Sequence, residues 1–289
     1  MLADYHLHSE FSDDAKEPME NQVERAIGLG FDEICFTDHV DYGIKKDWEE
    51  GEIQWRQGDG LSTDSVDLEP LANVDYPKYF EKLQQMQQRY GKQITIKKGL
   101  EFGVQTITVG KYEKLYDRYR DELDFVLLSM HQIDNKELGM TQDYQNGKTQ
   151  QEYNEGYYNE IYEVQKCFKN YCVLAHLDLM VRYDLQGIYP FEKVEDRIAE
   201  ILKLAIQDGK GIEINTSSWH YGLKDTMPSK KILKLYKDLG GTIVTIGSDA
   251  HTTKYLGDHI RNAQEILKNE IGIDQICTYK KMIPIFHEI

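Results

Sequence analysis

The sequence predicts an α/β fold built on a parallel sheet, and two observations support this prediction. Short apolar, β-branched runs alternate along the chain with longer stretches of helical periodicity, as they do in repeated βα units. The length of 289 residues suits one α/β barrel as well as it suits two smaller domains. Because βα units can close into a barrel or fan into a doubly wound sheet, the periodicity leaves both architectures open.

Seven segments have the composition of buried strands, and most are bounded by Gly, Asp or Asn. In chain order these strands are Leu2–Leu7, Glu33–Thr37, Ile94–Glu101, Phe125–Met130, Cys172–His176, Gly211–Asn215 and Thr242–Gly247. Segments with a helical apolar stripe lie between and after them. These helices are Met19–Leu29, Tyr76–Tyr90, Val109–Tyr119, Gln151–Asn170, Val194–Asp208, Ser229–Leu239 and Arg261–Lys268. No GxGxxG or GxxxxGK motif follows any strand, which argues against a nucleotide-binding fold.

The longest irregular stretch, residues 41–75, lies between the second strand and its helix. It is rich in Gly, Asp and Glu and contains Trp48 and Trp55. A loop of this length in a compact domain is usually functional, although a surface insertion is the alternative. Since no repeat or low-complexity linker divides the chain, we expect a single domain over residues 1–289 with this stretch as a long loop insertion.

The composition excludes several classes of protein. At 40% hydrophobic residues the chain can bury a core, and 34 Lys and Arg against 50 Asp and Glu give a charge of −16 that disfavours nucleic acid. No apolar run approaches the ~18 residues of a membrane span, and the start has no signal-peptide pattern. Four cysteines without a CxxC pair favour the cytoplasm. Such an acidic protein should also repel a phosphorylated substrate, unless bound cations reverse the charge locally.

The histidines concentrate at the ends of the predicted strands. Six of the nine lie at or just past a strand's carboxyl end: His6, His8, His39, His131, His176 and His251. The third strand ends in Glu101, and Asp249 follows the seventh. Ligands of parallel α/β folds bind at this end of the sheet, and imidazoles with carboxylates suit zinc, iron or manganese. The set exceeds the ligands of one tetrahedral ion, so we expect two or three divalent transition-metal ions.

These residues form a series of motifs in chain order. They are HxH (His6, His8), TDH (Asp38, His39), an isolated Glu101, SxH (Ser129, His131), AHxD (His176, Asp178) and SDxH (Asp249, His251). From residue 4 to about residue 255 the chain resembles the polymerase-and-histidinol-phosphatase (PHP) superfamily. The resemblance implies a distorted (β/α)7 barrel with a trinuclear metal centre, which matches the seven predicted strands. Residues 6–12, 213–217 and 227–229 resemble the stand-alone histidinol-phosphate phosphatases of that superfamily.

The resemblance implies the ligands of each metal. The first metal would be held by His6, His8, Glu101 and Asp249. The second would share Glu101 and use His131 and His176. The third would use His39, His251 and the acid six residues past His8, which is Asp14. Some relatives have His at that position, and the neighbouring Asp13 is an alternative ligand.

The implied activity is that of a metal-dependent phosphomonoesterase that hydrolyses L-histidinol phosphate to L-histidinol and phosphate in histidine biosynthesis. A hydroxide bridging two metals would attack the phosphorus, with Glu101, Asp249 and His251 as the catalytic residues at the centre. Asp249, His251 or His220 would return a proton to the leaving alkoxide. Arg182, just after the fifth strand, would clamp the phosphate. The loop after the sixth strand has no arginine, so His220 or Lys224 would supply the second basic group.

Two alternatives to this activity remain open in the sequence. One is a PHP phosphoesterase acting on another small phosphoester, such as a nucleotide or sugar phosphate; the other is a non-catalytic, metal-binding accessory module. We expect a small phosphorylated substrate, with no nucleic acid or membrane as partner and with the oligomeric state undefined. Candidate partners for the amine and imidazole of the substrate are Glu10, Asp41, Tyr42, Trp48, Trp55 and Phe102. His259 and His287 lie away from strand ends and are expected to be structural or on the surface.

Overall fold

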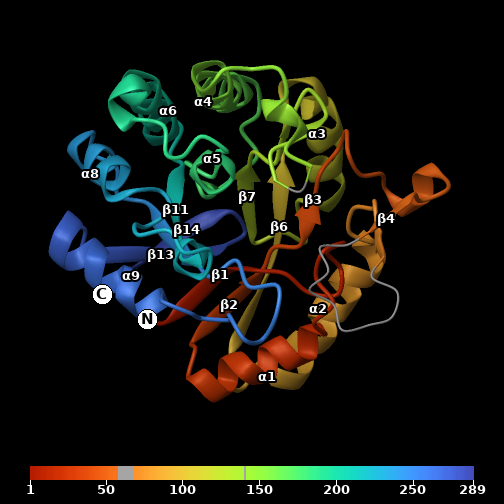
Figure 1. Cartoon of the computed structure of the whole chain (residues 1–289). Helices are drawn as coiled ribbons and strands as arrows, with labels where there is room; N and C mark the ends of the chain where they lie inside the picture. Colours follow the sequence, from red (N-terminus) through yellow and green to blue (C-terminus); the bar gives the residue numbers. More distant parts are fainter. Residues whose placement is uncertain (58–67, 140) are drawn as a thin grey trace.

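The computed structural model describes residues 1–57, 68–139 and 141–289, and its main sheet forms a nearly closed parallel barrel (Figure 1). Seven of the described strands follow one another around it: β1 (Ala3–Leu7), β2 (Glu33–Phe36), β6 (Thr95–Gly103), β7 (Phe125–Ser129), β10 (Val173–Leu174), β11 (Gly211–Asn215) and β12 (Val244–Gly247). The first and last strands meet where the His8 amide donates to the Ala250 carbonyl at 3.0 Å. The predicted (β/α)7 barrel is therefore confirmed, and the doubly wound alternative is not the observed fold.

Helices surround the strands as an outer layer (Figure 1). The long ones among the described residues are α1 (Met19–Leu29), α2 (Tyr76–Tyr90), α3 (Val109–Tyr119), α4 (Gln150–Cys167), α6 (Glu195–Gln207), α8 (Lys230–Asp238) and α9 (Ile260–Ile266). Each buries one apolar stripe, such as Tyr79, Leu83 and Met86 on α2. On α4, the buried tyrosines Tyr153 and Tyr157 belong to the core. The apolar spacing read from the sequence therefore places the helices correctly.

The predicted bounds differ from the observed ones mainly where the chain leaves the sheet. β10 ends two residues before His176, whose φ of 26° lies in the left-handed region and interrupts the strand. β6 continues two residues beyond the predicted end at Glu101. After α9 a π-helical turn covers Leu267–Ile271, and the chain closes with an antiparallel hairpin of β13 (Gln275–Lys280) and β14 (Ile283–Glu288) that the sequence pattern does not predict.

An apolar cluster fills the barrel near the amino ends of its strands. Tyr5 packs edge-on against Phe125 with ring centroids 4.9 Å apart, and the Tyr279 amide of β13 donates to the Tyr5 hydroxyl at 2.6 Å. Lys97 of β6 pairs with Glu33 of β2 at 3.6 Å in the same region. All four cysteines are free. No helix among the described residues is long and apolar enough to cross a membrane.

The stretch 41–75 is held by short elements. The chain passes through β3 (His39–Val40), which pairs with β6, and then through a single 3₁₀ turn at Trp48–Glu50. β4 (Trp55–Gln57) pairs antiparallel with β5 (Leu68–Pro70) on either side of the undescribed residues 58–67. Asn73 connects two parts of the stretch. Its side-chain Oδ1 accepts a hydrogen bond from the backbone N–H of Asp41, and its backbone N–H donates to the Lys46 carbonyl oxygen, both at 2.8 Å. At its start the stretch lies close to the predicted metal-ligand region: Asp41 is beside Gly103 at the carboxyl end of β6, and Lys45 contacts Asp13 in the turn between β1 and α1.

Candidate metal centre

Glu101 stands at the centre of the predicted ligands. It comes from β6, and its Oε2 lies 2.9 Å from His39 Nδ1, 3.2 Å from His6 Nε2 and 3.5 Å from His8 Nε2. Its Oε1 lies 2.8 Å from His176 Nε2 and 3.1 Å from His131 Nε2. Five histidines, which lie at the carboxyl end of β1 and just past β2, β7 and β10, thus converge on one fully buried carboxylate of β6.

Asp249 completes the part of the site nearest β1. Its Oδ1 lies 3.3 Å from His8 Nε2 and 3.6 Å from His6 Nε2. Because residues i and i+2 of a strand share a face, His6 and His8 approach the same carboxylates. The φ of Asp249 is 55°, in the left-handed region that a non-glycine residue rarely adopts. Such backbone strain is typical of functional positions and is held here by the surrounding sheet.

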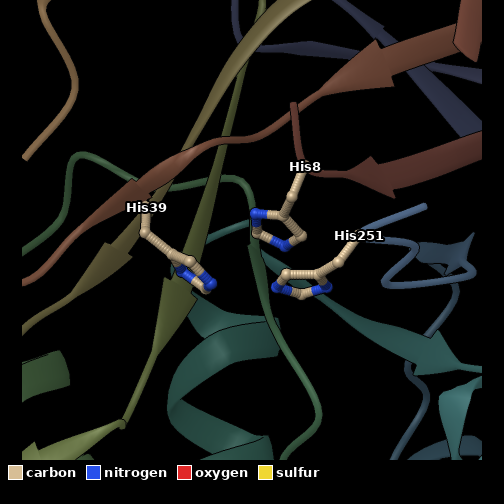
Figure 2. A group of neighbouring side chains, drawn as sticks. All are labelled: His8, His39 and His251. Atoms are coloured by element: carbon tan, nitrogen blue, oxygen red, sulfur yellow. The ribbon is translucent and has the colours of Figure 1, made fainter. Parts of the chain in front are cut away.

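Three histidines meet on the open side of the cluster (Figure 2). The ring of His8 stacks between those of His39 and His251, with centroid separations of 4.1 and 4.2 Å. Asp14 Oδ2 lies 3.5 Å from His39 Nε2 and 3.4 Å from His251 Nε2. Its neighbour Asp13 instead pairs with Lys45 at 2.5 Å, so Asp14 is the acid that faces these histidines.

The donor atoms fit bound metal ions. Four buried atoms that face one another have no hydrogen-bond partner among the described residues: His6 Nε2, His8 Nε2, His39 Nδ1 and Glu101 Oε2. Leaving such atoms unpaired is costly, so natural proteins rarely do it without a ligand or ion. The donor atoms form four groups of three, and within each group all three atoms lie within 4.8 Å of one another. The groups are His8/His39/His251, His6/Glu101/His176, His6/His8/Asp249 and His39/Glu101/His131. Mixed imidazole and carboxylate sets of this kind suit zinc, iron or manganese.

The charges in the cluster favour the metal-binding protonation state of some ligands and oppose it in others. Burial raises the pKa of Glu101, but the charges of His6 and His131 outweigh it and hold that pKa well below its ordinary value. Burial, together with the neighbouring charges of His39 and His251, lowers the pKa of His8 well below its ordinary value. Burial also acts to lower the pKa of His131, yet Glu101 and Asp41 raise it to about 9. An ionised carboxylate and a neutral imidazole are the ligand forms, whereas His131 must release its proton to bind.

Carboxylates behind two of the histidines fix the direction of their rings. Glu213 Oε1 lies 2.6 Å from His6 Nδ1, and Asp41 Oδ1 lies 2.8 Å from His131 Nδ1. These contacts occupy Nδ1 and leave Nε2 for the centre, the usual arrangement behind a metal-bound histidine. Two glycines make room for them: a Cβ at Gly247 would lie 2.6 Å from Glu213 Oε1, and one at Gly103 would lie 1.9 Å from Asp41 Oδ1.

The sequence prediction did not assign these supporting roles. Glu213 lies within one of the stretches that resemble the histidinol-phosphate phosphatases, and a charged residue inside the apolar strand Gly211–Asn215 is itself a signal, because an unpaired buried charge is costly. Asp41 was predicted as a substrate contact, but in the structure its carboxylate is engaged by His131 and Lys45.

The predicted phosphate-binding residues differ in how closely they approach the cluster. Arg182 lies on the short helix α5 (Met180–Tyr183), with Nη1 3.8 Å from Asp249 Oδ2 and its guanidinium carbon 3.2 Å from the centroid of the Tyr221 ring. His220 is the last residue of α7 (Ser217–His220), and its ring packs on that of Tyr255 with centroids 3.6 Å apart. Burial and the charges of Arg182 and Lys254 lower the pKa of His220. Lys224 is exposed and forms no ion pair with another described residue.

The remaining candidates fall into packing and surface positions. Phe102 is fully buried in the core and is not available to a substrate. Trp48 and Trp55 are exposed on the 41–75 stretch. His259 stacks on Trp219, and His287 forms a hydrogen bond with Thr278 Oγ1 at 2.8 Å. Both histidines therefore occupy the structural or surface positions expected of them.

Fold and site together define a (β/α)7-barrel protein with a multi-histidine metal centre at the carboxyl ends of its strands. The chain belongs to the PHP domain family, whose model matches residues 4–217. It is 28% identical over 283 residues to the histidinol-phosphatase of Lactococcus lactis subsp. lactis (strain IL1403), a match that covers 96% of this chain and 94% of that protein. The probable histidinol-phosphatase of Thermotoga maritima is 27% identical, with coverage of 92% and 91%.

A solved structure supports the same relationship. The crystal structure of histidinol phosphate phosphatase from Lactococcus lactis, complexed with zinc, L-histidinol and phosphate, superposes with a TM-score of 0.81 at 28% identity. The match covers 98% of both chains. The barrel, including the C-terminal region, is therefore shared over nearly the whole length.

Proposed function

We propose that this chain is a metal-dependent phosphomonoesterase that hydrolyses L-histidinol phosphate to L-histidinol and phosphate. The observation that carries the proposal is the convergence of six strand-end histidines on Glu101 and Asp249, in a chain similar over nearly its whole length to a phosphatase solved with zinc, L-histidinol and phosphate. No ligand position is degraded, which argues against a non-catalytic accessory module.

The ligand sets we propose are those that the resemblance to the PHP family implies, and short distances within each set support them. His6, His8, Glu101 and Asp249 would hold one ion, and Glu101 with His131 and His176 a second. Asp14, His39 and His251 would hold a third. Divalent ions bound there supply a deprotonated water at neutral pH and a positive charge for the phosphate oxygens. This local charge counters the repulsion that the acidic chain would otherwise exert on a phosphate.

Side chains of this protein supply the other parts of the reaction. Arg182 binds the phosphate through its fork of donors, and the Tyr221 ring holds the guanidinium flat. Asp249 lies between Arg182 and the histidines, so it is adjacent to the bound phosphate. We assign to Asp249 Oδ2, with His251 beside it, the proton transfer of the reaction: the ionised carboxylate takes up a proton released by the attacking water and passes it to the leaving alkoxide oxygen as the P–O bond breaks. His220 and Lys254 add positive charge near Arg182 when they are protonated. Further parts of the proposal are that residues 1–289 act as one domain, with the cytoplasm as its compartment.

The test is a panel of phosphomonoesters offered to the metal-replete enzyme. The panel includes L-histidinol phosphate, nucleoside monophosphates and sugar phosphates. We expect the highest kcat/KM for L-histidinol phosphate. A higher kcat/KM for a nucleotide or sugar phosphate would assign the same centre to another phosphoester.

A further inference from the structure

A buried lysine connects the 41–75 stretch to the metal centre. Lys45 is 7% exposed, and its Nζ donates to Asp13 Oδ1 at 2.5 Å and to Asp41 Oδ2 at 2.8 Å. Both carboxylates are buried as well. Burying a lysine is expensive unless its charge is paired, so an ion pair of this kind is retained where it has a structural or functional consequence.

The contact with Asp41 reaches a predicted ligand. Asp41 uses one oxygen for Lys45 and the other for His131 Nδ1, at 2.8 Å in each case. His131 in turn directs Nε2 to Glu101 at 3.1 Å. Gly103 confirms how closely these groups are fitted, because a Cβ there would lie 1.9 Å from Asp41 Oδ1 and 3.1 Å from His131 Nδ1. A shift of Lys45 would therefore change the orientation of His131.

The contact with Asp13 reaches a second ligand. Asp13 precedes Asp14 in the chain, and both are acids within the same turn before α1. Lys45 and, at 3.7 Å, Arg56 Nη2 hold the Asp13 carboxylate, while Arg56 also pairs with Glu137 at 2.6 Å. With Asp13 engaged in this way, Asp14 is left to face His39 and His251.

We propose that Lys45 is a positioning residue of the metal centre: it aims Asp41 at His131 and keeps the Asp13 carboxylate away from the ligand position that Asp14 occupies. The inference deepens the proposed function, because it assigns to the 41–75 stretch a role in metal binding. It predicts that loss of the Lys45 charge weakens metal binding by two routes, one through His131 and one through the competition of Asp13 with Asp14.

The experiment compares Lys45→Met with Lys97→Met. Lys97 is the matched control, because it is also a buried lysine paired with a carboxylate, Glu33, but lies near the amino ends of the strands. Both variants lose a buried ion pair and are expected to lower Tm. Metal affinity is measured by competition with a chelator, and metal content by elemental analysis. We expect a loss of affinity of about 10- to 100-fold for Lys45→Met, the usual effect of removing a group behind a metal ligand, and none for Lys97→Met.

Equal metal affinity in Lys45→Met and the parent protein would overturn the proposal and reduce Lys45 to a residue of stability alone. If Lys45→Met does not fold, Asp41→Asn tests the His131 route with a smaller change: reduced affinity supports that route, and unchanged affinity overturns the claim that Lys45 acts through Asp41 and His131. A further readout is kcat, which should fall for Lys45→Met at limiting Zn²⁺ and recover in excess. Because metal affinity is measured without substrate, failure of the proposed phosphatase activity would leave this result separately interpretable.

Discussion

The two ends of the barrel are built from the same strands but with opposite chemistry. The carboxyl ends deliver imidazoles and carboxylates, and four buried atoms of these groups face one another without a hydrogen-bond partner among the described residues. The amino ends deliver Tyr5, Phe125 and Cys35 to an apolar cluster that the C-terminal hairpin covers with Tyr279. Each end also contains a buried lysine, Lys45 or Lys97. The apolar packing at the amino ends requires no ligand, whereas the arrangement at the carboxyl ends is costly without bound metal.

The largest effect is expected from removing a ligand at the carboxyl end. His8→Ala removes a member of two of the four donor groups, so phosphatase turnover should fall to background while circular dichroism and the unfolding transition still show a folded protein. His259→Ala is the control, since His259 is exposed and stacks only on Trp219 among the described rings. Retained turnover in His8→Ala would contradict the ligand assignment.

At the amino ends of the strands we expect a large loss of stability without a loss of metal binding. Phe125 is fully buried against Tyr5 and Tyr279, so Phe125→Ala should lower the free energy of unfolding by about 3–5 kcal/mol. Denaturant titration measures this loss, with the exposed Phe286→Ala as control. The folded fraction should keep its metal content. A folded Phe125→Ala protein without metal would show that the two ends are not independent.

A smaller and more selective effect is expected for Arg182→Ala. Arg182 lies beside Asp249 but is absent from the donor groups, so its loss should leave metal content unchanged. Loss of a charge-assisted hydrogen bond costs about 2 kcal/mol, which corresponds to roughly a 30-fold increase in KM for phosphoesters. Steady-state kinetics measures it. An unchanged KM would reduce Arg182 to a residue that packs on Tyr221.

The smallest expected effect is on the pH dependence of stability and comes from Glu33 at the amino ends of the strands. Burial raises the pKa of Glu33 above its ordinary value of 4.5, and the hydrogen bond from Tyr5 and the charge of Lys97 offset this only in part. The folded state therefore binds this proton more tightly than the unfolded state, and its contribution to stability declines as pH rises from 4.5 through the folded pKa. Denaturant titrations of metal-depleted protein should show a shallower decline in Glu33→Gln. Identical pH slopes in the two proteins would refute this assignment.

The strand-end histidines could be predicted from sequence because the strand and the residue that follows it are both recognised from neighbouring residues. An apolar run identifies a strand, and the residue after it must lie at the sheet edge where ligands bind. The C-terminal hairpin has no such sequence signal. Its turn residues Lys281 and Met282 have positive φ values of 50° and 65°, whereas a two-residue turn of this kind usually contains Asn-Gly.

The supporting residues could not be predicted because their contacts are distant in sequence. Glu213 and His6 are separated by 207 residues, and Asp41 and His131 by 90. The choice between Asp13 and Asp14 depends on Lys45, which follows Asp13 by 32 residues. Local patterns therefore identify residues able to bind metal, whereas the tertiary contacts decide which atoms of those residues face the centre.

The most direct test of the account is elemental analysis of the purified, metal-replete protein. The donor groups around Glu101 predict two to three transition-metal ions per chain, and His8→Ala should contain fewer. Protein that is folded and retains no transition metal under metal-replete conditions would contradict the assignment of this centre, and with it the proposed phosphatase.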